Sequence, residues 1–150
     1  MEISLIEEFN APPARVFGAI TDLENWHKWM PGLVRVERLT QGEYGTGAQW
    51  RETRKMMGRE ATETFEVTAF EPGKSMELFV DGRKGSSGRG EYRFRYTFEE
   101  AGGRTRMTLH GTITGMGCLG AVFGWMFKGM FRKQIAKDHA ALRKYLESAA

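Results

Sequence analysis

Apolar and polar residues alternate in several short segments of the chain, beginning with Ile3-x-Leu5-x-Glu7-x-Phe9. A period of two predicts a strand with one buried face. Further strands are expected near 33–40, 48–56, 59–70, 75–81, 90–99 and 104–114, because Gly-rich or Pro-Gly turns separate these segments. Strands joined by such short turns pair antiparallel, so the pattern predicts an α+β domain rather than a parallel sheet.

The turns also predict how two pairs of strands align. A turn centred on Met57-Gly58 places Trp50 opposite Phe65 and Lys55 opposite Glu60. A turn at Gly102-Gly103 gives four apolar or aromatic pairs, which are Phe98 with Met107, Tyr96 with Leu109, Phe94 with Gly111, and Tyr92 with Ile113. The opposite face of this hairpin is polar, so the sheet is expected to be covered on one side only.

Helices are expected in two places. After the first strand, Asn10 can cap a short helix that carries Pro12-Pro13 at its start, and a second short helix near 23–29 ends before Pro31-Gly32. A long helix over about 119–146 is expected to cover the sheet. On a 3.6-residue period its buried stripe contains Leu119, Phe123, Met126, Phe127, Met130, Ala141 and Tyr145.

Composition narrows the class of protein. A chain of 150 residues with 41% hydrophobic and 27% charged residues suits one folded domain spanning 1–150. Its net charge is only +3 and the basic residues are dispersed, which disfavours nucleic-acid binding. A single cysteine and the lack of an apolar leader favour the cytoplasm. The longest apolar run, 118–127, is far shorter than the ~20 residues that span a bilayer.

The order of several short motifs resembles the SRPBCC superfamily, which includes START-like lipid carriers, pollen-allergen-like proteins and polyketide cyclases/dehydratases. The similarity begins with Ala11-Pro12, Val16-Phe17 and Asp22, and continues with Trp26-x-x-Trp29-x-Pro31-Gly32. Further matches follow at Gly45-x-Gly47-Ala48-x-Trp50, Phe70-Glu71-Pro72 and Gly103–Thr108. The resemblance extends over essentially the whole chain. Its motifs together are specific for the fold, but one scaffold can host many functions.

The resemblance implies a helix-grip fold, in which a curved seven-stranded antiparallel sheet is covered on its concave face by the long C-terminal helix. It also implies a cavity for an apolar small molecule between the two. The residues expected to line it are Trp50, Phe65, Val67, Leu78, Tyr92, Phe94, Tyr96, Met107 and Leu109 from the sheet, and Phe123, Met126, Phe127 and Met130 from the helix. The alternative is that these side chains fill a dry core. No cofactor is expected. No metal site is expected either, because the three histidines lack metal-ligand spacing.

Three charged residues are the candidates for chemistry. The predicted alignment places Glu52 opposite Glu63, with Arg54 on the same face. Two adjacent carboxylates repel, so one titrates at high pH unless Arg54 compensates, and such pairs support acid/base chemistry. These groups are expected either to form a polar end of the cavity or to be solvated at its mouth.

Three functions remain open on the sequence alone. The first is binding or transport of a small hydrophobic or amphipathic ligand, and the second is an enzyme like polyketide cyclases that uses Glu52 or Glu63. The third is a protein-interaction module. Trp125 projects away from the predicted stripe, where it either contacts a membrane or partner protein or is covered by residues 115–117 or a dimer mate. The Gly-rich segment 82–90 is either a mobile connection or a flap whose Arg83, Lys84 and Arg89 attract acidic headgroups. The chain is expected to be a monomer or a homodimer.

Overall fold

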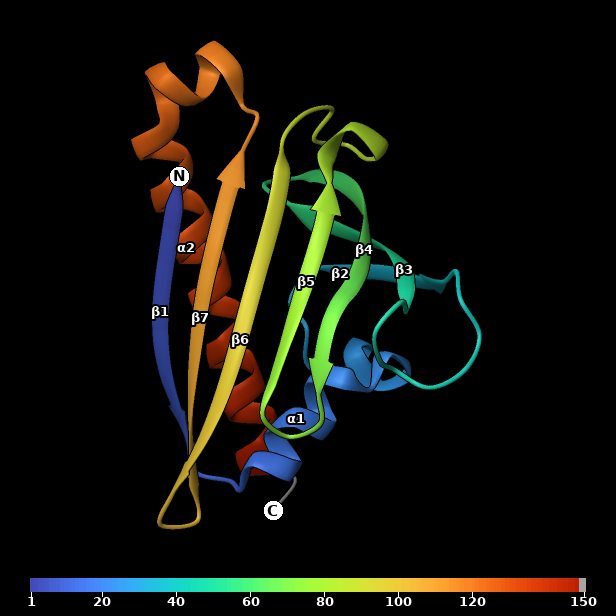
Figure 1. Cartoon of the computed structure of the whole chain (residues 1–150), viewed down its shortest axis with the longest axis vertical. Helices are drawn as coiled ribbons and strands as arrows, with labels where there is room; N and C mark the ends of the chain where they lie inside the picture. Colours follow the sequence, from blue (N-terminus) through green and yellow to red (C-terminus); the bar gives the residue numbers. More distant parts are fainter. Residues whose placement is uncertain (149–150) are drawn as a thin grey trace.

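Seven antiparallel strands form one curved sheet in the computed structural model, which describes residues 1–148. The strands are β1 (Glu2–Phe9), β2 (Leu33–Arg38), β3 (Gln49–Met56), β4 (Arg59–Glu71), β5 (Ser75–Asp81), β6 (Glu91–Ala101) and β7 (Arg104–Thr114). Their order is β1-β7-β6-β5-β4-β3-β2, and Figure 1 shows β2 and β3 turned strongly away from the direction of β6 and β7. The predicted α+β helix-grip architecture is confirmed.

Two short helices follow β1, as expected: α1 (Pro13–Thr21) and the 3-10 helix η1 (Leu23–Lys28). The prediction that Asn10 caps α1 is wrong, because the helix begins later and its N-cap is Pro12. The Pro12 carbonyl accepts hydrogen bonds from the backbone N–H groups of Arg15 and Val16. A third short helix, η2 (Gly82–Lys84), lies between β5 and β6.

The strand alignment of both hairpins is as predicted. Trp50 pairs with Phe65, Glu52 with Glu63, and Tyr96 with Leu109. Met57 and Gly58 both have positive φ angles, of 52° and 78°, as the tightest two-residue hairpin turns require. Irregular pairing between β2 and β3 and between β4 and β5 adds to the local twist that curves the sheet.

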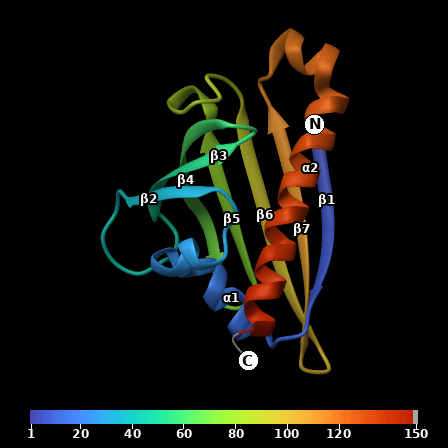
Figure 2. The same ribbon diagram turned by 180° about the vertical axis from the view of Figure 1, so that it is seen from behind.

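The long helix α2 (Gly117–Ser148) crosses the concave face, but the sheet buries only its second half. Leu142 is 1% exposed, whereas Phe123, Met126 and Met130 of the predicted stripe are 45%, 47% and 50% exposed. The prediction that these three side chains are buried is therefore wrong. In Figures 1 and 2 the first turns of α2 extend past the ends of β1 and β7, so no strand lies beneath them.

The stripe that does contact the sheet is shifted along the helix. Phe131 and Ile135 are half-buried, and His139, Leu142 and Leu146 are buried. Phe127, Ala141 and Tyr145 of the predicted stripe are half-buried, and the side chain of Leu119 lies outside the described part of the structure. Residues 127, 131, 135, 139, 142 and 146 follow one another at spacings of three or four, so they lie on one face of the helix.

Candidate functional site

The concave face carries the sheet residues that the sequence predicts there, and they are buried to different degrees. Trp50, Val67, Tyr92, Met107 and Leu109 are buried. Phe65, Leu78, Phe94 and Tyr96, on the same face of β4, β5 and β6, are half-buried. The concave face is thus apolar, and its half-buried residues on β4, β5 and β6 remain in partial contact with solvent.

Aromatic rings give this face a rigid wall. The ring of Phe65 stacks on Trp50 with centroids 5.5 Å apart and planes 2° apart. Trp26 of η1 meets Trp50 edge-on at 5.5 Å, so side chains from two other elements pack on this indole. From α2, Phe131 stacks on Tyr92 at 5.7 Å. Phe131 was not predicted from the sequence, although it continues the i, i+4 series from Phe127.

Arg54 lies at the centre of a polar cluster between β3 and α2. Its Nη1 and Nη2 donate to the two carboxylate oxygens of Asp138, each at 2.7 Å, and Nη2 also donates to the Pro31 carbonyl at 2.6 Å. Its Nε lies 3.8 Å from Oε1 of Glu52. The bidentate geometry is the strongest that an arginine makes with a carboxylate.

Glu52 is only 7% exposed, so the expectation that these charges are solvated is wrong for it. Burial raises the pKa of the Glu52 carboxyl to about 7, and the positive charge of Arg54 reduces this effect only in part. The negative charge of Asp138, which is bound to the same guanidinium, acts in the opposite direction to Arg54 and raises the pKa of Glu52. A carboxyl that titrates near neutrality can both donate and accept a proton at physiological pH.

Glu63 is paired with Glu52 along the strands, but its carboxylate interacts elsewhere. Oε1 accepts hydrogen bonds from the backbone N–H and the hydroxyl of Ser87, at 2.7 and 2.5 Å. The expected raised pKa at this pair therefore arises at Glu52 from burial and not from repulsion by Glu63. The contacts with Ser87 also tie the segment between β5 and β6 to β4, as does the bond from Ser86 N–H to the Thr62 carbonyl.

A second group of charges extends the cluster toward β1. Arg143 donates to the Glu7 carboxylate, and Nδ1 of the buried His139 lies 3.8 Å from Oε1 of Glu7. Tyr96 meets His139 edge-on, with ring centroids 6.2 Å apart. Burial lowers the pKa of His139 and raises that of Tyr96, which favours the neutral form of both.

Glu7, Asp138 and His139 were not among the site residues predicted from the sequence. One signal was available, because Glu7 occupies an inward position in the alternating pattern of the first strand. A carboxylate at such a position requires a buried partner. The partners could not be identified, since they lie more than 130 residues away in the chain.

Three polar atoms of this region are buried and have no hydrogen-bond partner among the described residues. They are Trp50 Nε1, Arg54 Nε and His139 Nδ1. Two are obligatory donors, and the histidine nitrogen donates or accepts according to its tautomer. The cluster thus has spare hydrogen-bonding capacity beside an apolar surface.

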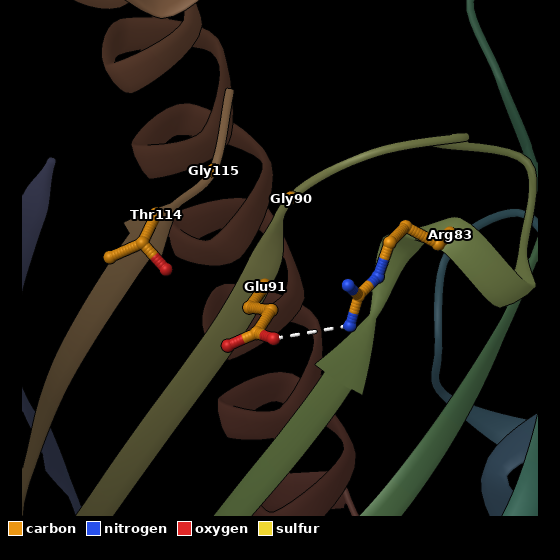
Figure 3. Close-up of a pocket in the computed structure, with 5 residues that line it drawn as sticks. All are labelled: Arg83, Gly90, Glu91, Thr114 and Gly115. Atoms are coloured by element: carbon orange, nitrogen blue, oxygen red, sulfur yellow. Dashed lines mark hydrogen bonds and ion pairs between the residues drawn. The ribbon is translucent and has the colours of Figure 1, made fainter. Parts of the chain in front are cut away.

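Two small hollows of the molecular surface lie elsewhere. One, of about 120 Å³, is lined by Arg83, Gly90, Glu91, Thr114 and Gly115, and Figure 3 shows the ion pair between Arg83 and Glu91 at its side. The other, of about 170 Å³, lies between η1 and β2. Both are smaller than the roughly 300 Å³ at which small-molecule sites begin. Neither corresponds to the cavity expected between the sheet and α2.

Comparison with solved structures shows the same fold in other proteins. A START superfamily protein from Mycobacterium smegmatis has a TM-score of 0.82 and 16% identity, with 99% of each chain covered. Protein TTHA0849 from Thermus thermophilus has a TM-score of 0.81 and 18% identity, over 100% of this chain and 99% of the other. The di-domain ARO/CYC BexL has a TM-score of 0.77 and 15% identity, over 98% of this chain and 46% of the other.

Identities this low show a common fold alone. No curated protein matches the chain. The family model described as polyketide cyclase / dehydrase and lipid transport matches residues 2–147, almost the entire sequence. The resemblance noted from the short motifs is thereby confirmed, and the chain belongs to this polyketide cyclase / dehydrase and lipid transport family of the SRPBCC superfamily.

Proposed function

We propose that this protein binds a small apolar or amphipathic molecule between the concave face of the sheet and α2. The observation that supports this most is the partial exposure of Phe65, Leu78 and Phe94 at the middle of an otherwise buried face. Apolar surface that remains wetted beneath a helix gains free energy when a ligand covers it, by roughly 25 cal/mol per Å². A mostly apolar surface with a few convergent polar groups is typical of small-molecule sites.

The polar cluster suits a neutral polar group of such a ligand. Arg54 and Asp138 cancel each other's charge, and the Glu52 carboxyl is only partly ionised near pH 7. The unpaired Arg54 Nε and Trp50 Nε1 are donors that a ligand carbonyl or hydroxyl can satisfy after a small side-chain movement. An anionic group of a ligand at this position would instead face the carboxylates of Glu52 and Asp138, which disfavours it.

Family membership supports the same function. The family description includes lipid transport, and a solved structure with this fold is titled as a START superfamily protein. Both fit a protein that encloses an apolar molecule. The site residues proposed for that role are Trp50, Phe65, Val67, Leu78, Tyr92, Phe94, Tyr96, Met107 and Leu109, together with Phe127 of α2. Phe131 and Ile135 are added here because they face the same strands.

Titration with N-phenyl-1-naphthylamine, a neutral apolar dye that fluoresces in apolar surroundings, tests this function. The wild type is expected to bind it and to release it when a competing apolar ligand is added. Leu78→Trp fills the concave face and is expected to weaken binding at least tenfold, whereas Leu39→Trp changes an exposed position and serves as the control. Equal binding by both variants, or no binding by the wild type, contradicts the proposal.

A catalytic role for Glu52 is the second candidate. A buried carboxyl with a pKa of about 7 can remove a proton from the carbon next to a ketone, as cyclisation of a polyketide chain requires. Deuterium exchange at the acidic carbon of 2-tetralone, followed by NMR, tests this directly. The exchange is expected to exceed the buffer rate and to fall to it in Glu52→Gln. Exchange that stays at the buffer rate in the wild type excludes this role for the probe.

A further inference from the structure

The first half of α2, Gly117–Met130, exposes large apolar side chains that nothing in the described part of the chain covers. The apolar end of α2 is defined here by Val122, Phe123, Trp125, Met126 and Met130, all of which are exposed. One interpretation of the sequence is that residues 115–117 cover Trp125. This is wrong, because Trp125 is 76% exposed. Contiguous apolar side chains on a surface mark a site of interaction.

The charge around this apolar end has one sign. From residue 115 to residue 137 the chain contains no aspartate or glutamate, while Lys128, Arg132, Lys133 and Lys137 are all exposed on the helix. An apolar surface bordered by cations is complementary to anionic headgroups over an acyl layer. Trp and Lys are the side chains that settle at the boundary between the two.

A second basic segment lies at the same end of the molecule. Figures 1 and 2 both show the connection between β5 and β6 beside the first turns of α2, beyond the ends of the strands. This connection exposes Lys84 and Arg89, whereas Arg83 is paired with Asp81 and Glu91. Two segments that are distant in the sequence thus carry exposed cations at the same end of the molecule.

A second copy of the chain suits this surface less well than a lipid surface. A two-fold dimer through the apolar end of α2 places the same lysines and arginines of both copies against each other. No helix within residues 1–148 combines the length and the hydropathy that are required to span a bilayer. A helix with exposed Trp, Phe and Met side chains and flanking cations is suited to lie at the interface.

We propose that the apolar end of α2 docks on bilayers that contain anionic phospholipids, with Trp125 and Met126 among the headgroups and Lys128 and Lys133 facing phosphates. The charge complementarity and the uncovered apolar side chains carry this inference. It does not depend on what the concave face binds, so the two proposals can fail separately.

Co-sedimentation with phospholipid vesicles tests the docking. The wild type is expected to bind phosphatidylcholine vesicles containing phosphatidylglycerol at least tenfold more tightly than vesicles of phosphatidylcholine alone. Each Lys or Arg near an anionic surface contributes roughly fivefold. Lys128→Glu with Lys133→Glu is therefore expected to reduce binding more than tenfold.

The matched control reverses the same amount of charge at the other end of the molecule. Lys74→Glu with Arg104→Glu changes two exposed residues, one in the turn between β4 and β5 and one at the first position of β7. Both turns, β4–β5 and β6–β7, lie at the end of the molecule opposite the start of α2 in Figures 1 and 2. This variant is expected to retain most of the vesicle binding. Equal losses in both double variants indicate attraction by net charge alone and overturn the proposal.

Tryptophan fluorescence gives a second, independent measurement. Trp26 and Trp50 are buried and Trp29 is half-buried, so a blue shift on adding anionic vesicles is expected to come from Trp125 and to disappear in Trp125→Phe. A shift that survives this substitution contradicts the proposal. So does sedimentation velocity that shows a dimer which Trp125→Ser separates, because the occupant is then a second copy.

Discussion

The two halves of α2 differ in burial, and the difference is the opposite of what their composition suggests. The first half, Gly117–Met130, is rich in Phe, Met and Trp and exposes most of them, whereas the second half, Phe131–Ser148, contains more charged residues and is better buried. The difference comes from the sheet, because the strands extend beneath the second half and end before the first. Apolar character along a helix therefore indicates what it could contact, and the neighbouring elements decide what it does contact.

The second half is also held by charges. Asp138 binds Arg54 of β3, and Arg143 binds Glu7 of β1, so this part of the helix is attached to strands from both sides of the sheet. The first half has no acidic residue and forms none of the ion pairs found among the described residues. One half is suited to anchoring the fold and the other to contacts outside the chain.

The largest expected effect separates the two halves by stability. Leu142→Ala removes a fully buried side chain and is expected to reduce the free energy of unfolding by about 3 kcal/mol. Met126→Ala in the first half is expected to change it by no more than about 0.5 kcal/mol, as for other exposed positions. Urea denaturation measures both, and similar losses would show that the first half is packed after all.

The ion pair of the second half is expected to give the next largest effect. Asp138→Ala leaves the Arg54 guanidinium without its carboxylate, and we expect a loss of about 2–3 kcal/mol, since the pair is largely but not wholly buried. Lys137→Ala, at the adjacent exposed position, is the control and should be within about 0.5 kcal/mol of the wild type. Thermal unfolding of the three proteins tests this, and a neutral Asp138→Ala contradicts it.

Glu52, which lies beside the second half of α2, is expected to make the free energy of unfolding depend on pH. Its pKa is raised from 4.5 to about 7 in the folded chain, so the protonated form stabilises the fold fully below about pH 4.5. That contribution is lost as pH rises toward 7. Glu52→Gln does not ionise, so its advantage over the wild type should grow across this window, by roughly 3 kcal/mol. Urea denaturation at several pH values measures it, and exposed Glu60→Gln should show no such trend.

The smallest expected effect is a gain in the first half. Gly129 lies within α2, and a Cβ added there meets no atom within 4 Å, so Gly129→Ala should stabilise the protein by about 0.5–1 kcal/mol. Gly111→Ala is the contrasting variant, because its Cβ lies 3.2 Å from Cδ1 of Phe94 and a gain is not expected. Destabilisation by Gly129→Ala would mean that another part of the protein covers the first half.

Local chemistry decided much of the fold. The two-residue turn at Met57-Gly58 and the pair Gly102-Gly103 set the alignment of two hairpins, and alternation then assigned Trp50, Phe65 and Tyr96 to the concave face. These features depend on residues that are close in the sequence, where turn geometry and period-two patterning act. The same reasoning brought Glu52 and Arg54 together, since they are two positions apart on one strand.

Tertiary structure decided what the sequence pattern left open. The partner of Arg54 is Asp138, 84 residues away, and Glu7 contacts residues more than 130 positions later. Which half of α2 is buried depends on how far β1 and β7 extend beneath it. The sequence of the helix alone does not determine how far these strands extend. Hydrophobic periodicity is a property of one segment, whereas burial and the pKa of Glu52 arise only when several segments exclude water together.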